Sequence, residues 1–345
     1  MGKERLFYLD FVRALAAILI IMTHYNAVFL LADPQINSCY IWKEFPFNVY
    51  IGDLGVSLFL IISSAALTYV YSDKDFQIGK FYYKRWKTIY PMYWIAYICS
   101  FLIIYVYMGA WSATKVPRSH LLISVLGFDG YLADVIPTYY LVGEWFVGFI
   151  VIFYIIYPVL RWLLNKYPRA LAIGALAIYF VMLTFIPAEF RVARNIFIRL
   201  PELLFGMYFI KYIKKVNLPL AIGSIIVLGV NGVLKPKFSS NIQVTYVGIA
   251  AFLILVYIAQ FIHSKKCKYL FEWISKYSYA IFLIHHILIY NIMLTFNLYT
   301  ITHIESYLIF LGFCVVIAIL SKILFDVDHY VNKGVSKLLS RKQKQ

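Results

Sequence analysis

Long apolar stretches recur along the whole chain and are separated by shorter polar segments. Each stretch is close to the length of about 20 residues that an α-helix needs to cross the hydrocarbon core of a bilayer. Because a backbone inside lipid must satisfy its own hydrogen bonds, stretches of this length predict helices. The pattern predicts ten spans, at residues 6–31, 48–71, 87–108, 140–163, 170–187, 195–213, 218–234, 242–262, 278–298 and 304–325.

The composition favours a membrane protein over a soluble one. Of the 345 residues, 63% are hydrophobic and only 14% are charged, whereas soluble domains carry about 25% charged residues. The spans occupy nearly the whole chain, so we expect an all-α integral membrane protein with a single transmembrane domain over residues 1–330 and a basic tail over residues 331–345. The first apolar stretch contains ionisable residues and precedes many more spans, which indicates a retained helix rather than a cleaved signal peptide.

The formal net charge of +16 is compatible with nucleic-acid binding, but the distribution of the basic residues favours another interpretation. With the N-terminus inside, 23 of the 32 lysines and arginines fall in inner segments and 7 in outer loops. This bias is the signal that orients membrane proteins. We therefore expect a bundle of about ten helices with both termini cytoplasmic, surrounded by membrane lipids and without a nucleic-acid partner. The basic tail is expected to lie along anionic headgroups.

Two long outer loops, Ala32–Tyr50 and Gly109–Tyr139, mix aromatic residues, prolines and polar residues. Structureless loops of this length are uncommon, so we expect these two to form caps or a vestibule. The four cysteines show neither a metal-ligand spacing nor a disulfide framework, so no metal is predicted. The sequence shows no internal repeat and no pair of broken helices of the kind that transporters use.

The first predicted span carries an arginine and a histidine, Arg13 and His24. A charged side chain inside a span is costly and usually marks a functional site. The two residues are eleven positions apart, which is three helical turns plus roughly 20°, so they share one face and lie about 16 Å apart along the helix axis. That face combines a fixed cation near the inner surface with a titratable base deeper in the bilayer. Asp10 precedes Arg13 by one helical turn and can pair with it.

The predicted orientation sorts the other polar residues by depth. Arg85 opens the third span at the inner side, where it is either a ligand for an anion or a headgroup anchor. Near mid-depth lie Ser63 and His285, and in the outer layer lie Asp53, Glu144, Arg199 and Glu202.

Several of these residues also have a structural interpretation. Asp53 can cap the second helix, because it starts an apolar run. Arg199 and Glu202 are one helical turn apart and can form a private ion pair. His285 and its neighbour His286 point about 100° apart, so both cannot face one site.

Together the layers favour a transfer reaction. Cations at the inner surface suit an anionic donor from the cytoplasm, whereas a base and carboxylates in the outer layer suit a hydroxyl acceptor from outside. His24 is a candidate general base, because burial disfavours the charged form of an imidazole. Glu144 or Asp53 can orient that imidazole if the helices bring them together. The alternative for His24 is a hydrogen bond between helices.

Six motifs, in order along the chain, resemble those of a known family. The first has ten residues between Arg13 and His24 and follows the run Tyr8-Leu9-Asp10-Phe11-Val12. The other five are Gly52–Phe59, Phe81–Trp94, Trp145–Pro158, Arg199–Gly206 and Ser278–His285. Each motif is weak alone, but six at compatible positions are specific. By these motifs the chain resembles the membrane-bound acyltransferase-3 family, bacterial enzymes that acylate cell-surface glycans.

The resemblance implies a reaction in the bacterial plasma membrane. An acyl group, by family default acetyl, passes from cytoplasmic acyl-CoA to a hydroxyl of an extracytoplasmic carbohydrate, which is a surface glycan or its lipid-linked precursor. The resemblance also implies that His24 is the catalytic base, assisted by Glu144 or Asp53, and that Arg13 and Arg85 help to hold the donor. We further assign Ser63 and His285 to donor binding, and Arg199, Glu202 and Trp145 to acceptor binding.

The chain departs from the family pattern at two places. Many members have Ser-Gly where this chain has Ser63-Ser64. Many members also have a glutamate five residues after the fourth-span tryptophan, where this chain has Ile150, and Glu144 is the candidate replacement.

Two questions stay open at this point. The sugar hydroxyl can attack the thioester directly, or a protein group can be acylated first. A transporter or flippase for a glycan, lipid-linked sugar or acyl group is the alternative function, because intramembrane charges suit it as well. Consumption of acetyl-CoA would discriminate the enzyme from the transporter.

Overall fold

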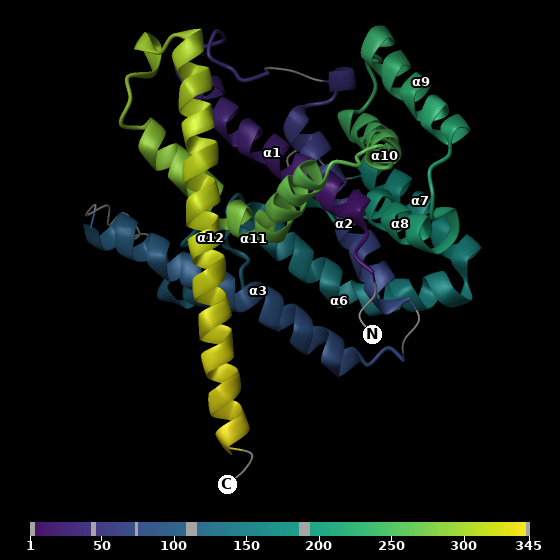
Figure 1. Ribbon diagram of the computed structural model, residues 1–345, viewed down its shortest axis with the longest axis horizontal. Helices are drawn as coiled ribbons and strands as arrows, with labels where there is room; N and C mark the ends of the chain where they lie inside the picture. Colours follow the sequence, from purple (N-terminus) through teal and green to yellow (C-terminus); the bar gives the residue numbers. More distant parts are fainter. Residues whose placement is uncertain (1–3, 43–45, 73–74, 108–115, 186–193, 343–345) are drawn as a thin grey trace. The chain divides into compact units, whose positions relative to one another are not determined.

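The computed structural model describes residues 4–42, 46–72, 75–107, 116–185 and 194–342. Within these ranges every regular element is helical and no strand occurs (Figure 1). The main helices are α1 (Phe7–Leu30), α2 (Ile51–Tyr71), α3 (Ile78–Phe101), α6 (Glu144–Lys166), α7 (Pro168–Phe185), α8 (Leu200–Tyr208), α9 (Leu218–Leu234), α10 (Ser240–Ala259), α11 (Lys265–Met293) and α12 (His303–Lys342). The short elements are α4 (Leu121–Val125), α5 (Asp129–Leu132), the 3-10 turns η1 (Pro46–Asn48), η4 (Arg118–His120) and η7 (Leu298–Thr300), and the π-helical turns η2 (Leu102–Tyr107) and η6 (Phe209–Ile213).

The described helices confirm the all-helical, multi-span prediction. A helix overlaps each of the ten predicted spans. In the described part of the chain, seven helices are long and apolar enough to cross a membrane, namely α1, α2, α3 with the turn that follows it, α6, α7, α10 and α12. Helix α9 is apolar but has only 17 residues. The chain is thus a multi-pass membrane protein, and the count of ten stays a prediction.

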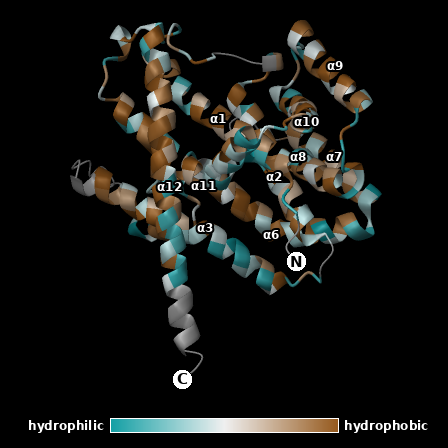
Figure 2. Cartoon of the chain, in the orientation of Figure 1, coloured by the Kyte–Doolittle hydropathy of each residue, from teal (hydrophilic) through white to brown (hydrophobic). Residues whose placement is uncertain are grey.

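Three helices extend beyond the predicted spans because charged residues continue them. Helix α3 begins at Ile78, helix α11 begins at Lys265, and helix α12 continues through residues that the sequence assigns to a basic tail. Lysine and arginine are good helix formers, so a helix does not end where hydrophobicity ends. Figure 2 shows this change along α12, which is mostly brown in its first part and then turns teal.

The start of α12 is fixed by a capping box. The backbone N–H and the hydroxyl of Thr302 both donate to Oε2 of Glu305, at 2.8 Å each. In return, the backbone N–H of Glu305 donates to the hydroxyl of Thr302 at 3.3 Å. This reciprocal arrangement satisfies donors that would otherwise be unpaired at the helix start.

The chain divides into two compact units, and each is described by itself. Unit 1 comprises residues 1–27, 40–76 and 155–278. Unit 2 comprises residues 28–39, 77–154 and 279–345. Helices α1, α6 and α11 contribute residues to both units.

Unit 1 is built around α2, which packs against α8 and α10. Its apolar core includes Leu58, Ile61, Phe209 and Phe252, all 1% exposed or less. The α2–α8 contact depends on Gly206, because a Cβ there would collide with the carbonyl oxygen of Ile61. Membrane helices associate closely through such small residues.

Unit 2 contains the described part of the second outer loop, which folds back onto α3. The indole N–H of Trp94 donates to the carbonyl of Val125 at 2.9 Å, and the hydroxyl of Tyr97 donates to the carbonyl of Tyr139 at 2.6 Å. Residues 116–139 therefore form a folded cap on this helix. Residues 109–115 of the same predicted loop lie outside the described ranges.

A part of the first outer loop binds the start of α12, also within unit 2. The hydroxyl of Ser306 donates to the carbonyl of Cys39 at 2.5 Å, and the His303 ring bonds the carbonyl of Ser38 at 2.6 Å. The predicted cap is thus confirmed for residues 116–139, and the described part of the first outer loop is held against α12, while residues 43–45 lie outside the described ranges.

Candidate active site

Helix α1 presents the predicted arginine and histidine from one continuous scaffold. Arg13 and His24 both lie in the uninterrupted helix Phe7–Leu30. Helical geometry therefore places the two side chains on the same face, about 16 Å apart along the axis. Both residues are half-buried in unit 1.

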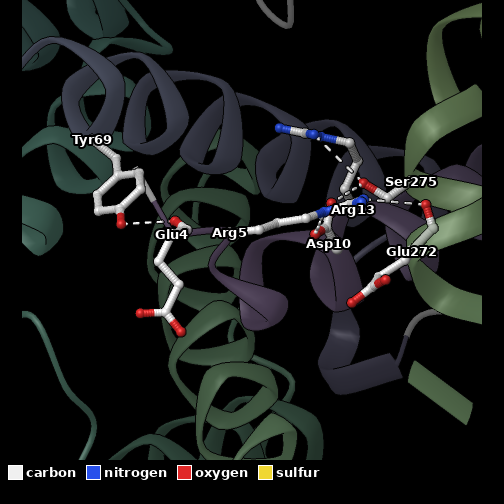
Figure 3. A network of polar contacts seen from close by, with 7 residues as sticks. All are labelled: Glu4, Arg5, Asp10, Arg13, Tyr69, Glu272 and Ser275. Carbon is white, nitrogen blue, oxygen red and sulfur yellow. Dashed lines mark hydrogen bonds and ion pairs between the residues drawn. The ribbon is translucent and has the colours of Figure 1, made fainter. Parts of the chain in front are cut away.

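A buried polar network holds the arginine end of this face (Figure 3). Nε of Arg5 lies 2.5 Å from Oδ2 of Asp10 in an ion pair. The hydroxyl of Ser275, on α11, donates to Oδ1 of Asp10 at 2.6 Å, and Nη1 of Arg13 donates to the same hydroxyl at 3.5 Å. Asp10 and Ser275 are only 6% and 4% exposed. Ser275 thus links the carboxylate to Arg13, and Asp10 also forms a direct ion pair with Arg5.

Sequence reasoning missed two members of this network. Arg5 precedes the helix and was not expected to reach Asp10, although its spacing of five residues is a detectable signal. Ser275 is 262 residues from Arg13 in the chain, and no local pattern marks it. Such a long-range contact becomes visible only once α1 and α11 are packed.

A second buried cluster lies in unit 1 between α2 and α8. Nε of Arg199 and Oε2 of Glu202 are 3.2 Å apart, with side chains only 2% and 0% exposed. Asp53, in the first turn of α2, interacts electrostatically with Arg199. The predicted ion pair is therefore present. The helix cap predicted for Asp53 is not, because Tyr50 occupies the N-cap position of α2.

This cluster has polar atoms without hydrogen-bond partners in the described part of the chain. They include Nη2 of Arg199 and Oε1 of Glu202, while the hydroxyl of Ser57 interacts with the Glu202 carboxylate. Buried polar groups in proteins are nearly always hydrogen-bonded, so such atoms need an explanation. A ligand that carries both hydroxyl donors and acceptors would satisfy them.

The histidine end of α1 meets α2 at the level of Asp53. A Cβ on Gly52 would lie only 2.8 Å from the methyl carbon of Thr23. Thr23 and Gly52 are the chain neighbours of His24 and Asp53, respectively. The close approach of the Thr23 side chain to Gly52 therefore brings the turns that carry His24 and Asp53 to the same level of unit 1. Ser63 lies further along α2 and is half-buried.

The other predicted site residues belong to unit 2. Arg85 is half-buried on α3, and its guanidinium carbon lies 5.6 Å from the ring centre of Tyr154. His285 is fully buried, and its Nδ1 bonds the carbonyl oxygens of Ile281 and Phe282 at 3.1 and 2.9 Å. These contacts give Arg85 an aromatic support and give His285 a fixed ring.

Two predicted residues lie at the start of α6, also in unit 2. Glu144 is the first residue of this helix, and its side chain lies outside the described part of the structure. Trp145 is half-buried and packs edge-to-face with Phe149, with ring centres 5.8 Å apart. The roles expected for both residues stay predictions.

The fold and the two polar clusters define a multi-pass membrane protein with ionisable groups held inside its helical core. Comparison with known families then makes the class specific. A family described as an acyltransferase domain matches residues 6–325, and the chain therefore belongs to the acyltransferase-3 family. This confirms the resemblance carried by the six motifs. Neither a curated protein nor a solved structure gives a match.

Proposed function

We propose that this membrane acyltransferase moves an acyl group, acetyl in the simplest case, from acyl-CoA at the cytoplasmic face of a bacterial plasma membrane to a hydroxyl of an extracytoplasmic carbohydrate. The observation that carries the proposal is the family match over residues 6–325, combined with Arg13 and His24 on one face of α1. An acyltransferase needs a base for the attacking hydroxyl and a cation for an anionic donor, and this face supplies both.

In the proposed reaction, neutral His24 removes the proton of a sugar hydroxyl as its oxygen attacks the thioester carbonyl. The carbon–sulfur bond breaks, the thiolate of CoA leaves, and the proton passes to the thiolate. Asp53 is the carboxylate best supported as the group that orients His24, because both lie at one level of unit 1. Acylation of a protein group before the sugar is the alternative order of steps.

The donor is proposed to meet Arg13, whose position is set by the Ser275–Asp10 link. The pantetheine arm is comparable in length to the separation of Arg13 and His24, about 16 Å. Ser63, Arg85 and His285 keep their predicted donor-binding roles.

The acceptor is proposed to use the buried cluster between α2 and α8. A carbohydrate hydroxyl both donates and accepts hydrogen bonds, which matches the unsatisfied guanidinium and carboxylate atoms of Arg199 and Glu202. Leaving such groups unpaired costs about 1–3 kcal/mol each, so a hydroxyl-bearing ligand would be favoured there. Trp145 keeps its predicted role in acceptor binding.

The test is the consumption of acetyl-CoA by purified full-length protein, followed by the release of free CoA thiol. The His24→Ala variant is expected to lose activity by at least about a hundredfold, because general-base catalysis contributes 10²–10⁴-fold. The matched control is His263→Ala, which removes an exposed histidine in a loop. An active His24→Ala enzyme would contradict the proposed base, and an intact thioester with the unmodified protein would favour the transporter.

The acceptor and the acyl group are identified in a second experiment. Mass spectrometry compares surface glycans from cells that express the chain with glycans from cells that do not. A mass difference names the acyl group and the sugar together. If the glycans are identical although acetyl-CoA is consumed, the acceptor is a hydroxyl compound other than a surface glycan.

A further inference from the structure

The second outer loop returns along α3 instead of staying at the outer end of that helix. The indole N–H of Trp94 donates to the carbonyl of Val125, the last residue of α4, at 2.9 Å. The hydroxyl of Tyr90 donates to the carbonyl of Leu126 at 3.1 Å. Both donors lie in the middle of the candidate membrane span Ile78–Ile104. Helix α4 therefore lies beside a part of α3 that hydrocarbon is expected to surround.

The depth of this contact follows from the length of α3. Trp94 lies ten residues before the end of the candidate span at Ile104, which is about 15 Å along the helix axis. A tilted helix shortens this depth but does not remove it, because spanning helices are tilted by only about 20° on average. The loop thus reaches back well inside the span, although its ends lie on the predicted outer side.

The surface that α4 turns away from the protein is apolar. Leu121, Leu122, Val125 and Leu126 are between 45% and 64% exposed. Their spacing of one and four residues places them on one side of the helix. Residues 121–128 contain no charged side chain. A single exposed leucine needs no explanation, whereas four large apolar side chains on one face form a surface that water disfavours.

The polar side chains of the same segment point toward the protein. The hydroxyl of Ser124 donates to Oδ1 of Asp129 at 2.9 Å, and both side chains are buried. The hydroxyl of Thr138 donates to the carbonyl of Asp129 at 3.2 Å. A loop that faces water would show the opposite distribution, with its polar side chains outside. The segment therefore has the polarity that a lipid-facing element needs.

The backbone contacts of α4 also suit an environment without water. The last carbonyls of a helix have no partner within that helix and usually bind solvent. Here the side chains of Tyr90 and Trp94 donate to the carbonyls at the end of α4. Non-helical backbone at membrane depth is tolerated where protein groups satisfy it in this way.

The apolar surface continues from α4 onto α3. Ile98 and Leu102 lie four and eight residues beyond Trp94, and both are exposed. Residues spaced by four occupy neighbouring turns on one side of a helix. The exposed face of α4 and this side of a predicted spanning helix are therefore next to each other. The occupant that fits both surfaces is the hydrocarbon of the bilayer.

Charged residues flank the apolar part of the loop and do not interrupt it. Arg118 lies three residues before Leu121, Asp134 lies in the returning arm, and both are exposed. The His120 ring bonds the carbonyl of Pro137 at 2.6 Å, so the two arms of the loop lie side by side. An arginine near a membrane surface extends its charged end toward the headgroups. These positions suit the level at which the loop enters and leaves the bilayer.

We propose that α4 and the turn after it, residues 121–126, form a re-entrant element whose apolar face lies against lipid acyl chains. The loop enters the membrane from the outer side and returns to the same side, so the predicted orientation of the spans is unchanged. The element rests on the contacts with α3 and not on the acyltransferase reaction. Its failure would leave the proposed function untouched, and the reverse also holds.

The experiment places a thiol on this face and measures which solvent surrounds it. Leu122→Cys and Leu126→Cys are made in the full-length protein. The matched control is Lys237→Cys, at an exposed position in the predicted outer loop between α9 and α10. Intact cells are treated with the charged reagent 2-sulfonatoethyl methanethiosulfonate, and the reaction of the parent protein, which has four cysteines, is subtracted. Size-exclusion elution of each purified variant reports its folding.

We expect both α4 variants to react at least about tenfold more slowly than Lys237→Cys, because the reactive thiolate is disfavoured in apolar surroundings. The use of two positions guards against a local effect at one of them. Reaction of the α4 variants as fast as that of the control would show that this face contacts water and would overturn the proposal.

A second measurement separates lipid from a protein that covers the same face. The introduced thiols are labelled with monobromobimane in detergent, and each variant is reconstituted into phosphatidylcholine vesicles. We expect a phosphatidylcholine with a nitroxide on its acyl chain to quench the α4 labels, and iodide in the water to quench only the label of Lys237→Cys. An α4 label that neither quencher reaches would show that a second copy or another protein covers the face, which also overturns the proposal.

Discussion

At the scale of single residues, the charges at the start of α1 are held by defined partners. Asp10 divides its two oxygens between Arg5 and Ser275, and Ser275 carries the link on to Arg13. Such compensation offsets the cost of burying ions. The positions of Asp10, Arg13 and His24 were predictable because they share one helix. The contact of Ser275 with these residues was not predictable, because no pattern near Ser275 in the chain indicates that it packs against α1.

Ser275 is expected to act as a positioning residue for the donor. Ser275→Ala removes the hydroxyl between Asp10 and Arg13, so the KM for acetyl-CoA should rise several-fold while the kcat changes less. A lost hydrogen bond to charged groups is worth about 1.5–3 kcal/mol, which sets the upper bound. Steady-state kinetics measure both constants.

A second variant keeps this test decisive. Ser275→Thr retains the hydroxyl and should recover most of the affinity for acetyl-CoA. An equal loss in both variants would indicate a packing role for Ser275 and no role in donor binding.

Asp129, in the folded cap of unit 2, should make stability depend on pH. The residue is 1% exposed, and burial raises the pKa of its carboxyl to about 6, against the lowering effect of a hydrogen bond from Ser124. Because the folded state holds this proton more tightly than the unfolded state, the stabilisation is fully present below the ordinary pKa of 3.8 and is lost as the pH rises through about 6.

The comparison of thermal unfolding at pH 4.5 and pH 7.5 checks this sign. Asp129→Asn stays neutral at both values, so its melting temperature should change less between them than that of the unmodified protein. An Asp129→Asn protein with the same pH dependence would show that other groups cause it.

At the scale of helices, close approach at glycine decides which elements meet. The hydrophobic pattern predicted that the segments around α2 and α8 are helices, because that pattern is local. It did not predict that α2 packs most extensively on α8, since this depends on backbone proximity at Gly206. The missed starts of α3 and α11 have a different cause, because charged residues there continue a helix beyond its apolar part.

Gly206→Ala should destabilise the α2–α8 contact. The added methyl group would meet the carbonyl of Ile61 and the hydroxyl of Ser64. Overpacking of this kind costs about 1–3 kcal/mol, so the melting temperature of the purified protein in detergent should fall.

The chain offers a matched control on α9. A Cβ at Gly223 meets nothing within 4 Å, so Gly223→Ala should leave the melting temperature unchanged or raise it slightly. Equal effects at both glycines would contradict the packing argument.

At the scale of the whole molecule, the family was more predictable than the arrangement of the site. The motifs identified the family because each is a short run of residues that can be recognised without a structure. The match over residues 6–325 confirms this family. The cluster of Asp53, Arg199 and Glu202 was predicted by residue type and layer, but its unsatisfied atoms became visible only in the structure.

The predicted orientation of the chain is tested by reporter fusions. A fluorescent protein that folds only in the cytoplasm should fluoresce when fused after Gln345, because the basic residues place both termini inside. Alkaline phosphatase, which is active only outside, should be active when fused after Lys237, in the predicted outer loop between α9 and α10. The opposite pattern of activity would invert the assignment of donor and acceptor sides.

Helix α12 runs for 40 residues without a break. At 1.5 Å per residue it is about 60 Å long, and even tilted by about 20° it exceeds the roughly 40–45 Å of a complete bilayer. One end of this helix must therefore emerge into water as a rigid rod. Because the apolar part of α12 comes first, the predicted emergent end is the C-terminal one, and it would move as one body with the membrane-embedded turns of this helix.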